Sequence, residues 1–276
     1  MHAHASFKLT TLSTALLLAF APLAQPVFAN PTLNGVEVQA QREALSAASV
    51  QVAKEKLSQT AGGTAVVEAE NFEAGKAVTI KDMLDFTPGV FAQSRVNEEA
   101  RLSIRGSGLS RTFHMRGIRL LQDGIPINLA DGGSDFQDID PLALQHVEVY
   151  KGANALQYGA ASLGGAINFV TPTGYTTPNT VLRLDAGSHE FARAQFKAGD
   201  VLGDWDYFAS LSQLRSDGFR QFSGQKNTRL NANAGLKISP QLETRFYVIH
   251  GDMNQELPGN LSKAQLQTDP TQANAA

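Results

Sequence analysis

The sequence predicts an α+β domain followed by antiparallel transmembrane β-strands. Residues 60–172 mix helix and strand signals with glycine-rich turns. After Pro172 the pattern changes to strict alternation of apolar and polar residues, typical of strands with two different faces. The alternating segments are joined by connections that are short at one end and long at the other. This asymmetry, together with strands of about ten residues, is typical of an outer-membrane β-barrel.

Composition narrows the classes of protein. The chain has 276 residues, a net charge of −3 and no cysteine. The charge therefore provides no positive potential that would attract nucleic acid. Without cysteine the protein cannot be stabilised by disulfides, even if it is exported. No apolar run of about 18 residues follows residue 29, so the sequence predicts no membrane-spanning helix.

The first 29 residues have the plan of a secretory signal peptide. Lys8 precedes the short apolar run Leu9–Ala21, and Ala29 provides a small residue for cleavage. The alternative is a buried N-terminal helix, which Pro22 and Pro26 would break.

Local signals place the elements of the α+β domain. Thr79 is a candidate N-cap for a helix over Ile80–Phe86, which Pro88 and Gly89 would end. Asp123-Gly124 between two apolar segments predicts a tight hairpin. Two more strands are expected at Val147–Tyr150 and Ala166–Val170.

Five alternating segments follow the α+β domain. They are Thr180–Ala186, Ala192–Ala198, Trp205–Ser212, Arg229–Ile238 and Leu242–Val248. We expect one apolar, lipid-facing side, on which Trp205, Tyr207 and Phe246 lie. A soluble β-sandwich also alternates and is the alternative. Five strands cannot close a barrel, so we expect residues 178–276 to be the truncated start of one.

Several motifs in order resemble the TonB-dependent outer-membrane receptor family, the transporters of siderophores and cobalamin. They are Leu102–Gly106, Leu121–Pro126, Val147–Gly152, Gln157–Gly159 and Gly164–Thr171. The resemblance implies that residues 46–172 form a plug domain inside a barrel that has 22 strands in the complete receptors. It also implies location in the outer membrane, contact with its lipid, and a monomer.

The segment 30–45 contains a stretch that resembles the TonB box. Its residues are Val36, Glu37, Val38, Gln39 and Ala40. The implied partner is a TonB-type energy transducer in the periplasm, to whose sheet this segment would add a strand. The alternative is a disordered leader that happens to contain two valines.

The resemblance also implies two sets of site residues. Arg105 and Lys151 match the plug cations that pair with glutamates of the barrel wall, although either could be an ordinary surface cation. The substrate-facing apex of the plug is expected at Arg95, Asn97, Glu98, Ser107, Ser110, Arg111, Asp131, Ser134, Asp135 and Phe136. Some of these would be bystanders.

No catalytic, cofactor or metal site is expected. The four histidines after residue 29 are scattered without ligand spacing. The carboxylates Asp131, Asp135, Asp138 and Asp140 suit either a Ca²⁺ site or a solvated polar loop, and we favour the loop.

The expected function is therefore energy-coupled uptake of an iron–siderophore or other ferric chelate, without covalent chemistry. Within the same family, cobalamin, another metal chelate or a carbohydrate are alternative substrates. From a different class, the alternative is a soluble periplasmic or surface binding module.

Export makes a direct prediction. If the signal peptide is cleaved after Ala29, mass spectrometry of the mature protein should find an N-terminus at Asn30. An exported protein that retains Met1 would contradict this expectation.

Overall fold

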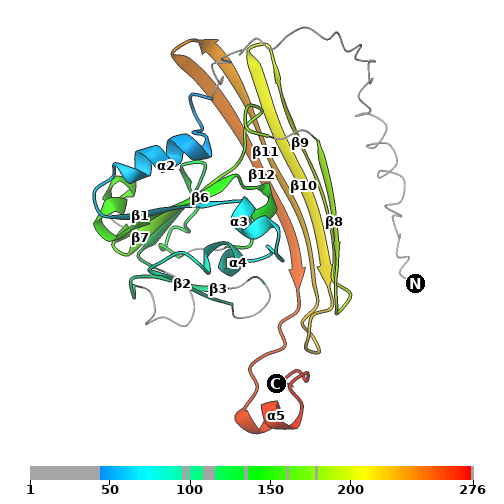
Figure 1. Ribbon diagram of the computed structural model, residues 1–276. Helices are drawn as coiled ribbons and strands as arrows, with labels where there is room; N and C mark the ends of the chain where they lie inside the picture. The colour runs from blue at the N-terminus through cyan, green and yellow to red at the C-terminus, as the bar shows by residue number, and fades with distance from the viewer. Residues whose placement is uncertain are drawn as a thin grey trace, which may run out of the picture. The chain divides into compact units, whose positions relative to one another are not determined.

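The computed structural model describes residues 44–94, 98, 100–107, 116–133, 136–159, 162–177 and 180–274. These residues belong to a single unit of the structure. Its first part is an α+β domain (Figure 1). The elements of this domain are α2 (Val50–Ser58), β1 (Gly63–Glu68), α3 (Glu70–Glu73), α4 (Ile80–Leu84), β2 (Val90–Ser94), β3 (Ala100–Ile104), β4 (Ile118–Gln122), β5 (Ile125–Pro126), the 3₁₀ helix η1 (Pro141–Ala143), β6 (His146–Lys151), the 3₁₀ helix η2 (Gly152–Tyr158) and β7 (Gly165–Val170).

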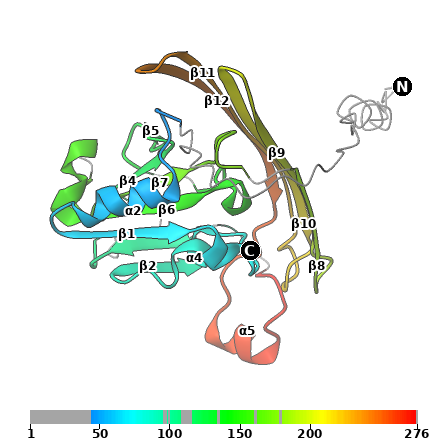
Figure 2. The same cartoon turned by 45° about the horizontal axis from the view of Figure 1, so that its top comes forward.

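A mixed sheet forms the centre of this domain. Its strand order is β1-β6-β7-β4-β5, and β4 and β7 run parallel while the other pairs are antiparallel. One face carries Val147, Val149 and Phe169 and packs in the main apolar core with α3 and α4. The other face carries Tyr150 and Ala166, which pack against Leu57 of α2. Figure 2 shows α2 and α4 on the two sides of this sheet.

The expected helix and hairpin are both present. Thr79 and Asp82 form a reciprocal capping box at the start of α4, with the Thr79 N–H donating to Asp82 Oδ2 over 2.8 Å. The helix ends at Leu84, two residues earlier than predicted, because the chain turns there ahead of Pro88. In the hairpin, Asp123 and Gly124 both have positive φ, 52° and 79°, as a type I′ turn requires.

The second part is a curved five-stranded antiparallel sheet, which we call the wall sheet. Its order is β12-β11-β10-β9-β8. The elements of this part are β8 (Val181–Ala186), β9 (Ala192–Leu202), β10 (Trp205–Ser216), β11 (Gln225–Ser239), β12 (Leu242–Gln255) and the short helix α5 (Lys263–Thr268). Figure 1 shows the α+β domain lying along one face of this sheet.

The predicted alternation of the wall sheet is confirmed. Trp205 and Phe246 are 49% and 65% exposed on the outer face, whereas Asp206 and Ser210 are buried on the inner face. Strands β11 and β12 are longer than predicted, because they remain paired as far as Gln225 and Gln255. Short turns join β9 to β10 and β11 to β12, while the connections between β8 and β9 and between β10 and β11 are longer.

Two glycines with positive φ provide a test of the packing between β3, β6 and β7. A Cβ atom at Gly165 would overlap the Tyr150 carbonyl and lie 2.7 Å from Ile104 Cδ1, whereas one at Gly159 would meet no described atom within 4 Å. Both Gly→Ala changes strain the backbone. Gly165→Ala should lower the free energy of unfolding by a further ~1–3 kcal/mol, because the added methyl group overpacks the site.

Hydrogen–deuterium exchange of the full-length protein measures the difference. Peptides from β6 and β7 should exchange faster in Gly165→Ala than in Gly159→Ala. Equal exchange in the two variants would show that the close approach at Gly165 has no consequence for stability.

Candidate functional site

The inner face of the wall sheet is mostly polar and yet buried, with Phe208 and Leu214 of β10 as apolar exceptions. Its buried polar residues are Arg193, Gln195, Asp206, Ser210, Ser212, Asn227, Arg229, Asn231 and Asn233. Polar groups that leave water need hydrogen-bond partners within the protein. The α+β domain supplies many of these partners, so the interface between the two parts is the first element of the candidate site.

The centre of this interface consists of neutral and singly charged hydrogen bonds. Gln122 Nε2 at the end of β4 donates to Asn231 Oδ1 over 2.9 Å. Ser212 Oγ donates to Asp140 Oδ2 over 2.6 Å. Asp140 also caps η1, because it accepts from the Leu142 N–H. The same side chain therefore shapes its own loop and fastens that loop to the wall.

A charged cluster lies between β8–β9 and the segment between α3 and α4. Arg193 bonds Asp185 on the wall and donates from Nη1 to the Ala77 carbonyl over 2.8 Å. Lys197 Nζ lies 3.1 Å from a Glu73 carboxylate oxygen. These contacts join the wall sheet to the helical side of the α+β domain.

Glu98 forms a buried ion pair with the wall. Its carboxylate accepts from Arg229 and Asn227, and its side chain is only 2% exposed. Burial raises the pKa of Glu98 above its ordinary value, while the Arg229 charge opposes that rise. Arg229 Nε also donates to the Gln137 carbonyl over 2.8 Å. Glu98, which was expected at the substrate-facing apex, is thus bonded to β11 of the wall sheet.

The side chains of Arg105 and Lys151 both lie beside Gly63. The Arg105 guanidinium lies over Gly63 so closely that a Cβ there would overlap it, and Lys151 Cδ is also close to that position. Lys151 is buried, and burial, with a smaller effect of the Arg105 charge, lowers the pKa of its ammonium. No salt bridge to either cation is formed within the described ranges of the chain. Two cations this close together are suited to bind an anionic group, such as a carboxylate, that the five strands of the wall sheet do not supply.

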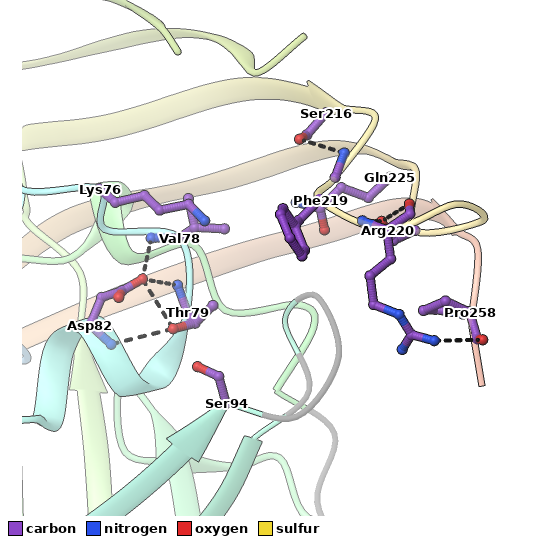
Figure 3. A pocket seen from close by; sticks show the side chains of 12 residues that line it. Lys76, Val78, Thr79, Asp82, Ser94, Ser216, Phe219, Arg220, Gln225 and Pro258 are labelled. Carbon is purple, nitrogen blue, oxygen red and sulfur yellow. Dashed lines mark hydrogen bonds between the residues drawn. The ribbon is translucent and has the colours of Figure 1, made fainter. Parts of the chain in front are cut away.

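Cavities open at the end of the wall sheet that carries the longer connections. One, of about 330 Å³, lies between Lys76, Thr79 and Asp82 on the α+β domain and Phe219 and Arg220 on the β10–β11 loop, as Figure 3 shows. An adjacent cavity of about 480 Å³ shares Lys76 and Phe219 with it and is also lined by the β8–β9 connection.

Some of the polar side chains around these cavities already form hydrogen bonds within the protein. Asp82 is engaged in the cap of α4. Arg220 donates to the carbonyls of Gly259, Pro258 and Gln272 at 2.7–3.1 Å, so it ties two outer segments together.

Lys76 and Phe219 line both cavities, and the Phe219 ring packs edge-to-face against the His189 ring with 5.7 Å between their centroids. The Lys76 ammonium lies 5.9 Å from the Phe191 ring centroid, and Phe219 is 58% exposed. The sequence analysis missed Lys76 and Phe219. The unusual presence of Phe219 in a long polar loop was the one available signal for the latter.

Other expected apex residues have different roles in the structure. Phe136 is buried in the main apolar core, which corrects its expected contact with substrate. Ser107 Oγ donates to the Ile104 carbonyl. Asp131 forms a salt bridge with Arg116 on the surface.

The remaining expected site residues cannot be placed. Arg95, Asn97, Ser110, Arg111, Ser134 and Asp135, and the predicted TonB box at residues 36–40, lie outside the described residues.

Two searches of the described residues were negative. No group of three or more His, Asp or Glu side chains is arranged there to hold a metal ion. No helix in the same part of the chain is long and apolar enough to cross a membrane.

An apolar outer face, a mostly polar inner face and a domain hydrogen-bonded to that inner face are the features of one segment of a plugged outer-membrane β-barrel. Comparison with known proteins agrees. Residues 56–166 match the family described as the TonB-dependent Receptor Plug Domain. The chain is 29% identical over 210 residues to the vitamin B12 transporter BtuB of Vibrio vulnificus, which covers 76% of the chain and 33% of the transporter. It is 26% identical over 202 residues to the ferrichrome outer membrane transporter/phage receptor of Escherichia coli, covering 70% and 26%.

Comparison of folds finds a similar solved structure. The unliganded ferric citrate transporter FecA superposes with a TM-score of 0.66 at 21% identity, covering 80% of this chain and 35% of that one. The chain therefore spans about a third of the relatives that it matches. The match over residues 56–166, the curated relatives and the shared fold all point to the TonB-dependent receptors of the outer membrane, and we call the α+β domain the plug from here on.

The paired cations Arg105 and Lys151 generate a prediction. If Arg105 pairs with a buried carboxylate elsewhere on the barrel, Arg105→Ala leaves that carboxylate unpaired and should weaken plug docking by about 3–5 kcal/mol. The full-length receptor in planar bilayers should then show a higher single-channel current. Arg116→Ala is the matched control, because Arg116 belongs to an exposed pair. Equal conductance of wild type and Arg105→Ala would indicate an ordinary surface arginine.

Proposed function

We propose that this chain is the plug and the first wall strands of a receptor for energy-coupled uptake of a ferric chelate across the outer membrane. The observation that carries the proposal is the polar, hydrogen-bonded seat of the plug against the wall, with cavities at the long-loop end. Such a plug closes the barrel at rest, and its displacement would expose a mostly polar surface, with Phe208 and Leu214 of β10 as apolar exceptions.

The outer face of the wall supports the membrane part of the proposal. Leu182 and Leu184 are 68% and 72% exposed, and they continue the apolar face of Trp205 and Phe246. A soluble β-sandwich would cover such a face with a second sheet. Here the covered face is the polar one, which favours a barrel in lipid over the soluble binding module.

The cavities support binding at the outer surface. Long connections face outward in barrels of this kind, and short turns face the periplasm. The cavities around Lys76 and Phe219 lie at the long-loop end, so a chelate arriving from outside would meet them first. A cationic ammonium beside aromatic rings is suited to an anionic, partly apolar chelate. The receptor would bind it without changing its covalent bonds.

Cobalamin is the second candidate substrate. The vitamin B12 transporter of Vibrio vulnificus matches over 76% of the chain, and the plug alone does not separate the two substrates. Growth of a deletion strain on ferric chelates or on cobalamin, supplied separately, would decide between them.

Energy coupling is assigned to the N-terminal segment. Residues 36–40 precede the plug directly and have the alternating valines of an added strand. A TonB-type transducer that pairs with this segment could pull on the plug from the periplasm.

The coupling segment can be tested by removing one backbone donor. Proline has no N–H and cannot extend a ladder in mid-strand, so Val36→Pro should abolish energised uptake, while Val36→Ala should be tolerated. Radiolabelled ferric-chelate binding and uptake are measured in whole cells that carry the full-length variants.

Binding to the outer surface is the internal control of this experiment. It should survive in both variants, because neither change alters a residue that lines the outer cavities. Wild-type uptake by Val36→Pro would remove residues 36–40 from the coupling mechanism.

A further inference from the structure

The chain that enters the plug is bound to the wall sheet before the first plug helix begins. We call residues 44–48 the strap. The Leu45 N–H donates to Glu243 Oε2 over 2.8 Å, and the Ser46 hydroxyl donates to Glu243 Oε1. Arg245 Nε donates back to Ser46 Oγ over 2.8 Å. Glu243 and Arg245 lie on β12 near its short turn, and therefore at the periplasmic end of the wall.

Arg245 connects the strap to a second part of the wall. Its two Nη atoms donate to the two carboxylate oxygens of Asp206 over 2.8 and 2.7 Å, a bidentate pair. The Arg245 and Asp206 side chains are 1% and 2% exposed. Arg245 Nη1 also donates to Asn233 Oδ1 over 2.7 Å. Fork-like pairing of this kind fixes direction as well as distance.

Asp206 and Asn233 in turn bind the residues that follow the last strand of the plug. Asp206 Oδ1 accepts from the Gly174 N–H over 3.0 Å. Asn233 Nδ2 donates to the Pro172 carbonyl over 2.9 Å and to Thr171 Oγ1 over 3.2 Å. Residues 171–174, which we call the junction, are the chain that leaves the last plug strand for the wall.

We propose that Glu243 and Arg245 form a latch that fastens both the strap and the junction to the wall, so that a pull on the strap is transmitted through Arg245 to the junction. The use of this latch in transport rests on the proposed function, because the strap follows the segment assigned to energy coupling. Glu243 and Arg245 act as positioning residues, since neither lies at the outer cavities.

A cavity with polar side chains lies under the strap, and water could enter it when the latch is released. The cavity has a volume of about 480 Å³ and lies between the strap, Asp123, His146, Glu148 and Tyr247. His146 is fully buried, and its Nε2 lies 3.8 Å from Glu148 Oε1, beyond hydrogen-bond distance; neither ring nitrogen has a hydrogen-bond partner among the described residues. Burial raises the pKa of Asp123 to about 6. These groups would gain hydration when the strap moves, which lowers the free energy of the released state.

The cavity is also connected to the junction. Asp123 Oδ1 accepts from the Thr171 N–H over 2.8 Å and from the Thr171 hydroxyl over 3.0 Å. Thr171 therefore has partners on both sides, Asp123 in the plug and Asn233 in the wall. Water entering under the strap would reach the contacts that hold the junction.

Cysteine labelling tests the latch without an energy source or a partner protein. The 276 residues contain no cysteine. In a full-length receptor whose remaining cysteines, if any, are replaced by serine, Ala44→Cys and Thr173→Cys are single reporters at the buried strap and junction positions, which are 8% and 2% exposed. Each is placed in the purified full-length receptor in detergent, and its rate of reaction with a membrane-impermeant maleimide is measured.

The two latch residues are expected to act differently. Glu243→Ala should speed labelling at position 44 by roughly tenfold or more, because it removes charged hydrogen bonds from the strap, and should leave position 173 slow. Arg245→Ala should speed labelling at both positions. Glu190→Ala is the matched control, because Glu190 belongs to an exposed pair at the long-loop end, and it should change neither rate.

Folding is checked by heat-modifiable gel mobility. If Arg245→Ala does not fold, Arg245→Lys replaces it, because lysine keeps the charge and loses the bidentate fork. It should speed labelling at both positions by a smaller factor. An unchanged rate at position 44 in Glu243→Ala, or Arg245 variants that expose position 44 alone, would overturn the latch.

The result is independent of the transport assay. Labelling as expected, combined with normal uptake by Val36→Pro, would leave the latch in place and refute the coupling segment. Unchanged labelling, combined with loss of uptake in Val36→Pro, would refute the latch and leave energy-coupled transport in place.

Discussion

The polar inner face of the wall must be hydrogen-bonded by the plug, and the rest of the structure depends on this constraint. Asn231, Ser212 and Arg229 lie on strands whose other face is apolar, so they cannot turn outward without entering lipid. The plug meets them with side chains such as Gln122 and Asp140 that end strands or cap short helices. The loops of the plug are thus shaped by partners far away in the sequence.

The two kinds of contact have different physical properties. The plug is held together internally by an apolar core around Val149 and Phe169, which would be costly to expose to water. It is held to the wall by hydrogen bonds and ion pairs, each of which can be exchanged for water at modest net cost. A plug of this construction can leave its seat while it remains folded, which is what displacement by a periplasmic partner requires.

The two ends of the interface are specialised. At the long-loop end, Arg220 binds three carbonyls and organises outer segments around cavities that contain Lys76 and Phe219. At the short-turn end, Glu243 and Arg245 hold the entry and exit of the plug. Under the proposed function, substrate binding and energy coupling would therefore act on the plug from opposite ends.

The amino-acid sequence by itself determined whatever depends on neighbouring residues. The capping box at Thr79, the hairpin at Asp123-Gly124 and the two faces of the wall strands all follow from local chemistry and a period of two. The pairing of Arg105 and Lys151 with barrel glutamates came from a family resemblance and stays a prediction, whereas their proximity is seen only in the structure.

Only the tertiary structure decided which side chains are buried and which polar side chains are paired. Phe136 and Glu98 lie in segments that read as exposed polar loops, yet one is in the core and the other is paired with Arg229. The contact of Ser46 with Glu243 joins residues at nearly opposite ends of the chain. Burial and pairing of this kind depend on where distant strands place their side chains, and a local pattern carries no information about that position.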